Sequence, residues 1–181
     1  MELSALSSRL ARRGTLAAAL MAACFAAPAQ TPPTTFGTIV GSALLCRDDI
    51  DNQYFYDYFA KALGPAYKHD GGAYWFRLNG ATLWGVSVTE VMVSDDTSPF
   101  VFVGAVAETT PEKLEQAIID QVGVHYAKID SSAFPVREAK PASRIVYFDR
   151  KSKIYCAKFK PLRPTQPPPV RAPMPTPRVI R

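Results

Sequence analysis

The chain has 181 residues, of which 48% are hydrophobic and 20% charged, a composition that suits one folded domain and argues against wholesale disorder. Its formal net charge is +5, but the excess of Lys and Arg lies before residue 30 and after residue 159, while the middle of the chain is slightly acidic. A nucleic-acid-binding domain would carry its basic patch on the folded part. We therefore do not expect nucleic acid as a partner.

Residues 1–29 show, in order, the features of a bacterial signal peptide. Three arginines lie among the first thirteen residues, an apolar run follows at 16–27, and Ala27-Pro28-Ala29 supplies the small residues that a signal peptidase needs. The apolar run is too short to span a bilayer, and no second long apolar stretch follows it. We expect cleavage before Gln30, a periplasmic or secreted product, and no transmembrane span in the mature chain.

A second processing route stays open. Met21-Ala22-Ala23-Cys24 resembles a lipobox, in which the cysteine becomes the lipid-bearing first residue of an outer-membrane lipoprotein. Leu is usual where Met21 stands, so the match is imperfect. We favour the interpretation in which Cys24 is an ordinary apolar residue of the signal peptide.

The mature chain divides into three parts by composition. Residues 30–36 are rich in Pro and Thr and are predicted to be a flexible leader. Residues 37–160 are predicted to form a single domain. Residues 161–181 contain eight prolines and four arginines but no acid, and a proline-dense segment without an apolar period does not form a packed core. We predict a disordered basic tail there.

Two amphipathic helices are predicted. In the first, at 51–63, aromatic and aliphatic residues recur at helical spacing, and Gly64-Pro65 ends it. In the second, at 111–122, Pro111 lies in the first turn, Thr109 and Glu112 fit a capping box, and a glycine follows the last turn. A polar loop is expected from His69 to Gly72.

Alternating or continuous apolar runs predict strands over most of the remaining chain. Within 82–94 the alternation changes phase, which indicates a bulge near Thr89-Glu90. A charged turn at 149–153 separates the last two strands. The predicted strands are 73–78, 82–94, 100–107, 125–130, 133–137, 144–148 and 154–159.

These elements predict an α+β domain whose sheet is mostly antiparallel, with two helices on one face. Gly and Tyr recur after each predicted helix, in Gly64-Pro65-Ala66-Tyr67 and Gly123-Val124-His125-Tyr126. About three strand signals follow each match. A duplicated α-β-β-β unit is one hypothesis for this pattern. Two matched positions also arise by chance, so an unrepeated domain stays the alternative.

The cysteines predict one disulfide. Once Cys24 is removed or acylated, Cys46 and Cys156 remain, an even pair in an oxidising compartment. Neither belongs to a C-x-x-C motif and neither has a histidine beside it, which argues against a reactive thiol. We expect the bond to tie the start of the domain to its last strand.

No catalytic or metal-binding pattern stands out. His69 is a weak candidate base because a loop histidine without partners lacks the rest of a catalytic set. Glu90 is a carboxylate inside an apolar strand, and an outward residue at a bulge explains it more simply. Asp48, Asp49 and Asp51 lack the glycine of a calcium loop and fit the start of a helix instead. We predict neither a metal nor a cofactor.

Aromatic residues provide the candidate binding patch. Tyr74, Trp75, Phe76 and Trp84 fall in two neighbouring predicted strands, and adjacent residues of a strand point to opposite faces. If the second face is uncovered, some of these rings are exposed, and exposed aromatic surface marks interaction sites. A sheet covered on both faces is the alternative.

The leading functional hypothesis is therefore a small exported binding or accessory protein of the bacterial cell envelope. We expect it to be non-catalytic and to bind a protein or another envelope component. Two alternatives stay open: a hydrolase of envelope polymers that uses carboxylate catalysis, and an outer-membrane lipoprotein anchored through Cys24.

Overall fold

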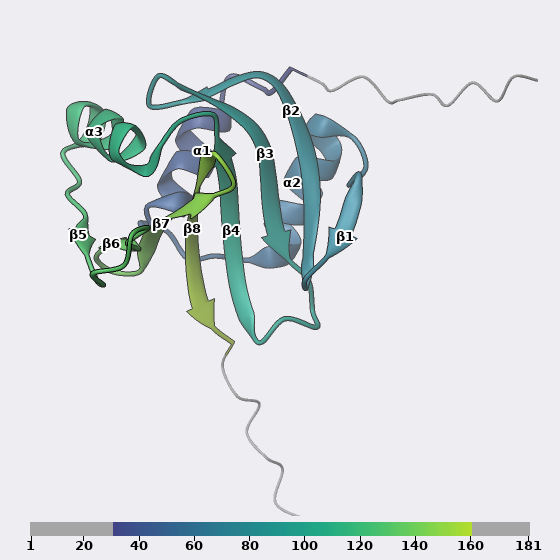
Figure 1. Cartoon of the computed structure of the whole chain (residues 1–181). Coiled ribbons are helices and arrows are strands. Elements are labelled where there is room, and N and C mark those ends of the chain that lie inside the picture. Colours follow the sequence, from purple (N-terminus) through teal and green to yellow (C-terminus); the bar gives the residue numbers. More distant parts are fainter. Residues whose placement is uncertain (1–30, 161–181) are drawn as a thin grey trace, which may run out of the picture.

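A computed structural model describes residues 31–160 of the chain (Figure 1). The predicted signal peptide, the lipobox-like segment and the predicted proline-rich tail all lie outside the described residues. Of the predicted leader, residues 31–35 are described and residue 36 already begins a helix.

Eight strands form one sheet, in which every neighbouring pair is antiparallel (Figure 1). Their order across the sheet is β1-β2-β3-β4-β8-β7-β6-β5. The antiparallel α+β prediction is therefore confirmed. The strands are β1 (Lys68–Asp70), β2 (Ala73–Leu83), β3 (Val86–Ser94), β4 (Phe100–Ala107), β5 (Ala127–Lys128), β6 (Arg137–Ala139), β7 (Ser143–Phe148) and β8 (Lys151–Phe159).

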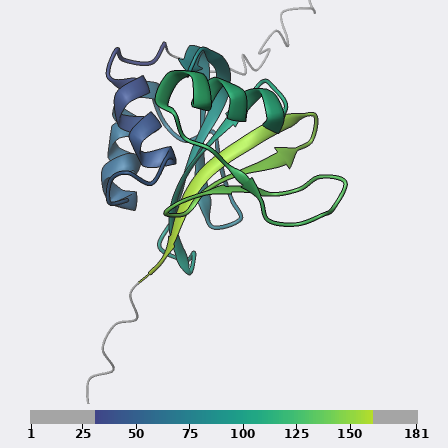
Figure 2. The ribbon, with the colours of Figure 1, turned by 90° about the vertical axis from the view of Figure 1, so that its left-hand side faces the viewer.

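Three helices pack on the same face of this sheet (Figure 2). They are α1 (Phe36–Leu44), α2 (Asn52–Leu63) and α3 (Pro111–Val122). Their buried residues share one core with every second residue of the central strands, for example Phe59 of α2 with Phe76 of β2. Burying this apolar face is the main favourable term in the folding of such a layered domain.

The helix prediction was incomplete. The two expected helices are present as α2 and α3, but α1 is a third helix that the sequence analysis did not predict. Its signal is weak because no side chain caps it and because Gly37 and Gly41 lower its helix propensity. At α3 the capping residue is Thr110, not Thr109, since the Thr110 side chain accepts a hydrogen bond from the backbone N–H of Lys113.

The segment predicted as one strand from 82 to 94 is two strands joined by a tight turn. Trp84 and Gly85 form that turn with positive φ angles of 51° and 78°, which is the pattern of a two-residue hairpin loop. The predicted bulge is confirmed, because the register of β3 against β4 shifts between Val88 and Glu90. The loop expected at His69 contains the short edge strand β1.

The strand order divides the sheet into two halves that meet at β4 and β8. Each half consists of a helix followed by four strands, α2 with β1–β4 and α3 with β5–β8. The halves differ in size, since β1 and β2 have 3 and 11 residues while β5 and β6 have 2 and 3. A duplicated unit is not shown and stays a hypothesis.

The predicted disulfide is present. Cys46 follows α1 and Cys156 lies in β8, with their Cα atoms 5.4 Å apart. Both residues are buried on the covered face. The bond links positions 110 residues apart and so holds α1 against the centre of the sheet.

We predict that the double variant Cys46→Ser/Cys156→Ser loses a large part of the stability of the domain. The bond closes a loop of 110 residues, for which the loop-entropy model gives roughly 4–5 kcal/mol of unfolding free energy. Urea denaturation of the oxidised protein and of the variant measures the difference. A reductant should lower the urea midpoint of the wild type and leave that of the variant unchanged. Equal midpoints for the oxidised wild type and the variant would contradict the prediction.

Candidate functional site: the open face of the sheet

None of the described helices covers the second face of the sheet, which faces the viewer in Figure 1. We call it the open face. Its side chains are set by the antiparallel register, because directly paired residues point to the same side. One such row crosses five strands and consists of Trp75, Met92, Gly104, Tyr155 and Arg144.

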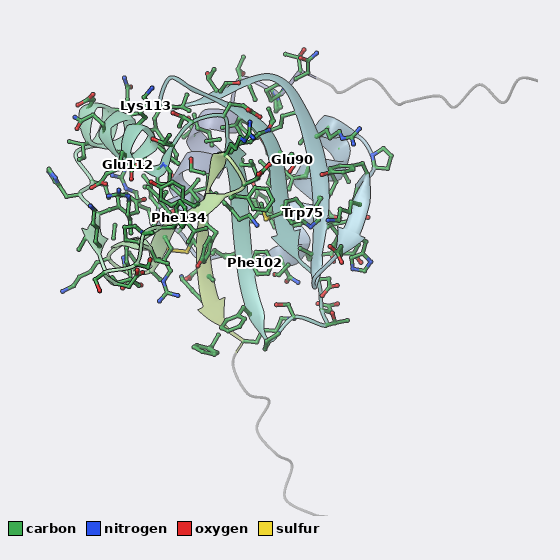
Figure 3. All side chains as sticks on the ribbon, in the orientation of Figure 1. Trp75, Glu90, Phe102, Glu112, Lys113 and Phe134 are labelled. Atoms are coloured by element: carbon green, nitrogen blue, oxygen red, sulfur yellow. A yellow bond between two sulfur atoms is a disulfide. The ribbon has the colours of Figure 1, made fainter. Side chains whose placement is uncertain are left out.

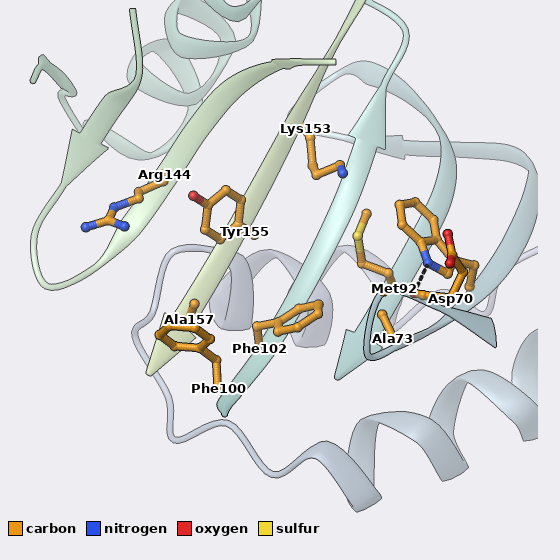
Figure 4. A pocket seen from close by; sticks show the side chains of 11 residues that line it. Asp70, Ala73, Met92, Phe100, Phe102, Arg144, Lys153, Tyr155 and Ala157 are labelled. Carbon is orange, nitrogen blue, oxygen red and sulfur yellow. Dashed lines mark hydrogen bonds between the residues drawn. The ribbon is translucent and has the colours of Figure 1, made fainter. Parts of the chain in front are cut away.

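The centre of the open face is a hollow of about 460 Å³ (Figure 4). Gly104 helps to create it, because a side chain there would meet Met92, whose Cγ lies 3.0 Å from the position of a Cβ. Met92 therefore lies flat over β4. The apolar and aromatic part of the lining comes from Ala73, Trp75, Met92, Phe100, Phe102 and Ala157.

Lys153 is the central cation of the hollow. Its Nζ lies 3.9 Å from the ring centroid of Phe148 and 5.0 Å from that of Trp75, so it rests on two aromatic faces. Among residues 31–160 it forms neither an ion pair nor a hydrogen bond. Burial lowers the pKa of Lys153, while the nearby charge of Glu90 acts in the opposite direction. A half-buried ammonium group without an anion is thus part of this surface.

The other two charged residues of the lining are already neutralised by partners. The Asp70 carboxylate accepts from Lys68, with Nζ and Oδ2 2.9 Å apart, and this contact lowers the pKa of Asp70. Arg144 donates through Nε to Glu138, at 2.6 Å. Lys153 is therefore the one lining charge that the described residues leave without a counter-charge in contact.

Glu90 lies on the open face beside the bulge, as the structural interpretation of the sequence predicted (Figure 3). Its carboxylate accepts a hydrogen bond of 2.7 Å from the Tyr67 hydroxyl. Burial and this bond raise the pKa of Tyr67 to about 12. Arg77 is the residue opposite Glu90 in the neighbouring strand, and its guanidinium lies 4.3 Å from the centroid of the Tyr67 ring.

The four aromatic residues predicted as one patch do not lie together. Trp75 is on the open face, where its ring stacks toward Phe148. Phe76 is 1% exposed in the core beneath the helices, and Tyr74 shares that side with it. Trp84 lies in the β2–β3 turn, against Gly41 of α1.

Most residues of the hollow were not predicted as a site from the sequence. Met92, Phe102 and Tyr155 were placed in predicted strands, but their common surface follows only from the strand register. The signal that could have found them is the alternation of large and charged residues at Phe100 and Phe102 and from Lys153 to Ala157, read together with strand pairing.

His69 lies in edge strand β1, and its ring is held from two sides. Nε2 donates to Oδ2 of Asp95 at 2.6 Å, and the ring stacks on Tyr74 at 4.2 Å. Asp95 is 5% exposed and also accepts from Thr97 and Ser98. Burial raises the pKa of Asp95, but these hydrogen bonds outweigh it and hold the value at about 2. The pair thereby fastens β1 to the turn between β3 and β4.

The predicted acid cluster near residue 50 has structural roles. Asp51 caps α2 by accepting from the backbone N–H of Tyr54 at 3.0 Å, and Asp49 accepts from Lys158 at 3.0 Å. Within residues 31–160, no three His, Cys, Asp or Glu side chains gather in a way that could hold a metal ion. No helix in the same range is long and apolar enough to cross a membrane.

No family model matches this chain, and neither curated proteins nor solved structures showed a significant similarity to it. The inference of function therefore depends on the chemistry of the open face.

We predict that Asp95→Asn reduces the acid sensitivity of the fold. The pKa of Asp95 is about 2 in the folded protein against 3.8 ordinarily, so its stabilisation is complete above about pH 4 and is lost as the pH falls toward 2. Without the carboxylate this loss, on the order of 2 kcal/mol, should disappear. Thermal melts between pH 7 and 2 measure it, with Asp57→Asn on the exposed side of α2 as control. A variant that loses as much stability as the wild type would contradict the role of Asp95.

Proposed function

We propose that this protein is an exported, non-catalytic binding protein of the bacterial cell envelope, and that it takes its ligand on the open face of the sheet. The observation that carries the proposal is the aromatic hollow around Lys153. It combines apolar surface, concavity and, among residues 31–160, a lysine without an anion in contact.

The side chains of the open face are more typical of a binding surface than of a sheet face that only contacts solvent. An antiparallel sheet with one uncovered face normally exposes polar side chains there. Here Met92 and Val106 form a small second core with Ala73, and Trp75 and Phe102 pack on it. A surface of this kind would be covered in a larger assembly or by a ligand, since contiguous apolar patches on monomers mark interaction sites.

The two candidate catalytic groups do not support a hydrolase. His69 pairs with Tyr74 and so lies on the helix side of the sheet, while Glu90 pairs with Arg77 on the open face. Groups on opposite faces of a sheet cannot act on one substrate atom. Each is also engaged already, His69 with Asp95 and Glu90 with Tyr67.

Export is supported by two independent features. The sequence of residues 1–29 has the pattern typical of a signal peptide, which directs a chain out of the cytoplasm. The disulfide between Cys46 and Cys156 is of a kind that persists in oxidising compartments.

The mature N-terminus provides a direct prediction. Expressed with its leader in a bacterial host, the protein should be recovered from the periplasm or medium with Gln30 as its first residue. Mass spectrometry of the intact protein decides this, and Ala29→Asp, which blocks the cleavage position, is the control. A mass that fits a lipid-bearing Cys24 would instead establish the anchored lipoprotein, and a full-length cytoplasmic product would contradict export.

The binding proposal predicts that Trp75→Ala strongly reduces capture of the natural ligand. Truncating a tryptophan at the centre of a binding surface costs ~2 kcal/mol or more, so we expect at least a tenfold fall in retained ligand. The tagged full chain, Trp75→Ala and Phe134→Ala are each incubated with envelope extract, and bound components are identified by mass spectrometry. Phe134 is a matched control because it is an aromatic residue 66% exposed, on a loop that does not line the hollow.

The expected result is a component that the wild type and Phe134→Ala retain and Trp75→Ala loses, with all three proteins giving the same circular dichroism spectrum. A component that all three retain equally binds elsewhere. That outcome would contradict the open face as the binding surface.

A further inference from the structure

We infer that the hollow of the open face binds an organic anion with an apolar body, whose anionic group contacts Lys153 while its body lies on Trp75, Met92 and Phe102. This inference rests on the proposed binding function and adds the chemical class of the ligand.

Lys153 has room for an anionic partner. Its ammonium group is half-buried and has no carboxylate in contact among residues 31–160, so part of its hydration is replaced only by the faces of Trp75 and Phe148. Such contacts offset part of the cost of desolvating a cation. An anion placed above the ammonium group would supply the missing charge-assisted hydrogen bond, and such bonds are stronger than those between neutral groups.

The position of Lys153 on the aromatic rings argues against a cationic ligand. Aromatic rings around a small hollow commonly recognise quaternary or methylated ammonium groups. Here the ring faces of Trp75 and Phe148 are already occupied by the chain's own cation. An external cation would meet Lys153 at close range and would be repelled.

The acids nearest the hollow already have partners of their own. The two acids nearest the hollow are bound to local partners, Asp70 to Lys68 and Glu90 to Tyr67. Neither is free to swing over and neutralise Lys153 without breaking an existing contact. Lys153 therefore stays without an anion in contact among residues 31–160, while Arg144 at the rim is paired with Glu138.

The size and shape of the hollow suit a small elongated molecule. A hollow of about 460 Å³ lies in the range of sites for small organic molecules. Its floor is the side chain of Met92, which is unbranched and adapts to ligands of different outline. Phe102 and Ala157 extend the apolar lining toward the end of β8, away from Lys153 (Figure 4). An anionic group on Lys153 thus leaves room for an elongated apolar body.

The experiment uses the two tryptophans of the chain. Trp84 lies on the helix side, so the full-length variant Trp84→Phe keeps Trp75 as the only tryptophan and makes its fluorescence a report from the hollow. Decanoate and decanol, both below the concentration at which they aggregate, have the same chain length and differ in the charge of the head. Decanoate should change the Trp75 emission saturably and bind at least about tenfold more tightly than decanol, the factor that one charge-assisted hydrogen bond supplies.

The decisive variant, in the same background, is Lys153→Gln. It should weaken decanoate binding by about tenfold and leave decanol binding unchanged, since only the anion uses the charge. Lys158→Gln is the matched control, because Lys158 lies on the same strand but faces the covered side, where it contacts Asp49. Circular dichroism verifies that each variant is folded.

Three results would overturn the inference. They are equal affinity for decanoate and decanol, equal loss of decanoate binding in both lysine variants, and no saturable response to decanoate.

Vesicles that contain phosphatidylglycerol form a separate arm: cosedimentation without binding of monomeric decanoate would mean that the face attaches to anionic membranes. Light scattering of the free protein tests a second copy as occupant, and a dimer dispersed by Lys153→Gln would replace the ligand by that copy. None of these results changes the outcome of the Trp75→Ala capture, which tests the proposed function separately.

Discussion

The structure depends on one constraint, the alternation of side chains along strands that are covered by helices on one side. Trp75 and Phe76 show it most clearly, because these neighbours in the chain belong to different environments. Phe76 is buried against α2, whereas Trp75 lies over the hollow of the open face. The helices can cover only one of the two sets. Every large apolar residue of the other set adds to the apolar surface of the open face.

Strand β8 connects the stability of the domain with its candidate site. On the covered side, Cys156 binds it to the end of α1 through the disulfide, and Ile154 is 1% exposed in the core. On the open side, Lys153 and Tyr155, which alternate with these two residues along the strand, belong to the hollow. A binding surface on a strand that is paired on both sides and cross-linked keeps its geometry when empty, which reduces the entropy lost on binding.

The sequence predicted the elements whose signals are local and missed the features that need pairing. α2 and α3 have apolar stripes, capping residues and glycine stops, so their positions were predictable. The turn at Trp84 was not, because a bulky residue with positive φ is uncommon and the flanking residues continue the strand pattern. The members of the row from Trp75 to Arg144 lie between residues 75 and 155 of the chain, and only the register brings them together.

The lysines of β8 support the proposal that the hollow binds a ligand. Lys151 forms an ion pair with Glu108 and Lys158 with Asp49, so the cations near the ends of the strand have acid partners. Lys153, between them and half-buried, has none within residues 31–160. For stability alone, the half-buried lysine would be the one with an acid partner, because the desolvation free energy of an unpaired charge rises as the charge leaves water. An apolar residue at 153 would pack on Trp75 and Phe148 without that cost. The position of Lys153 therefore supports the proposed binding of an external anion.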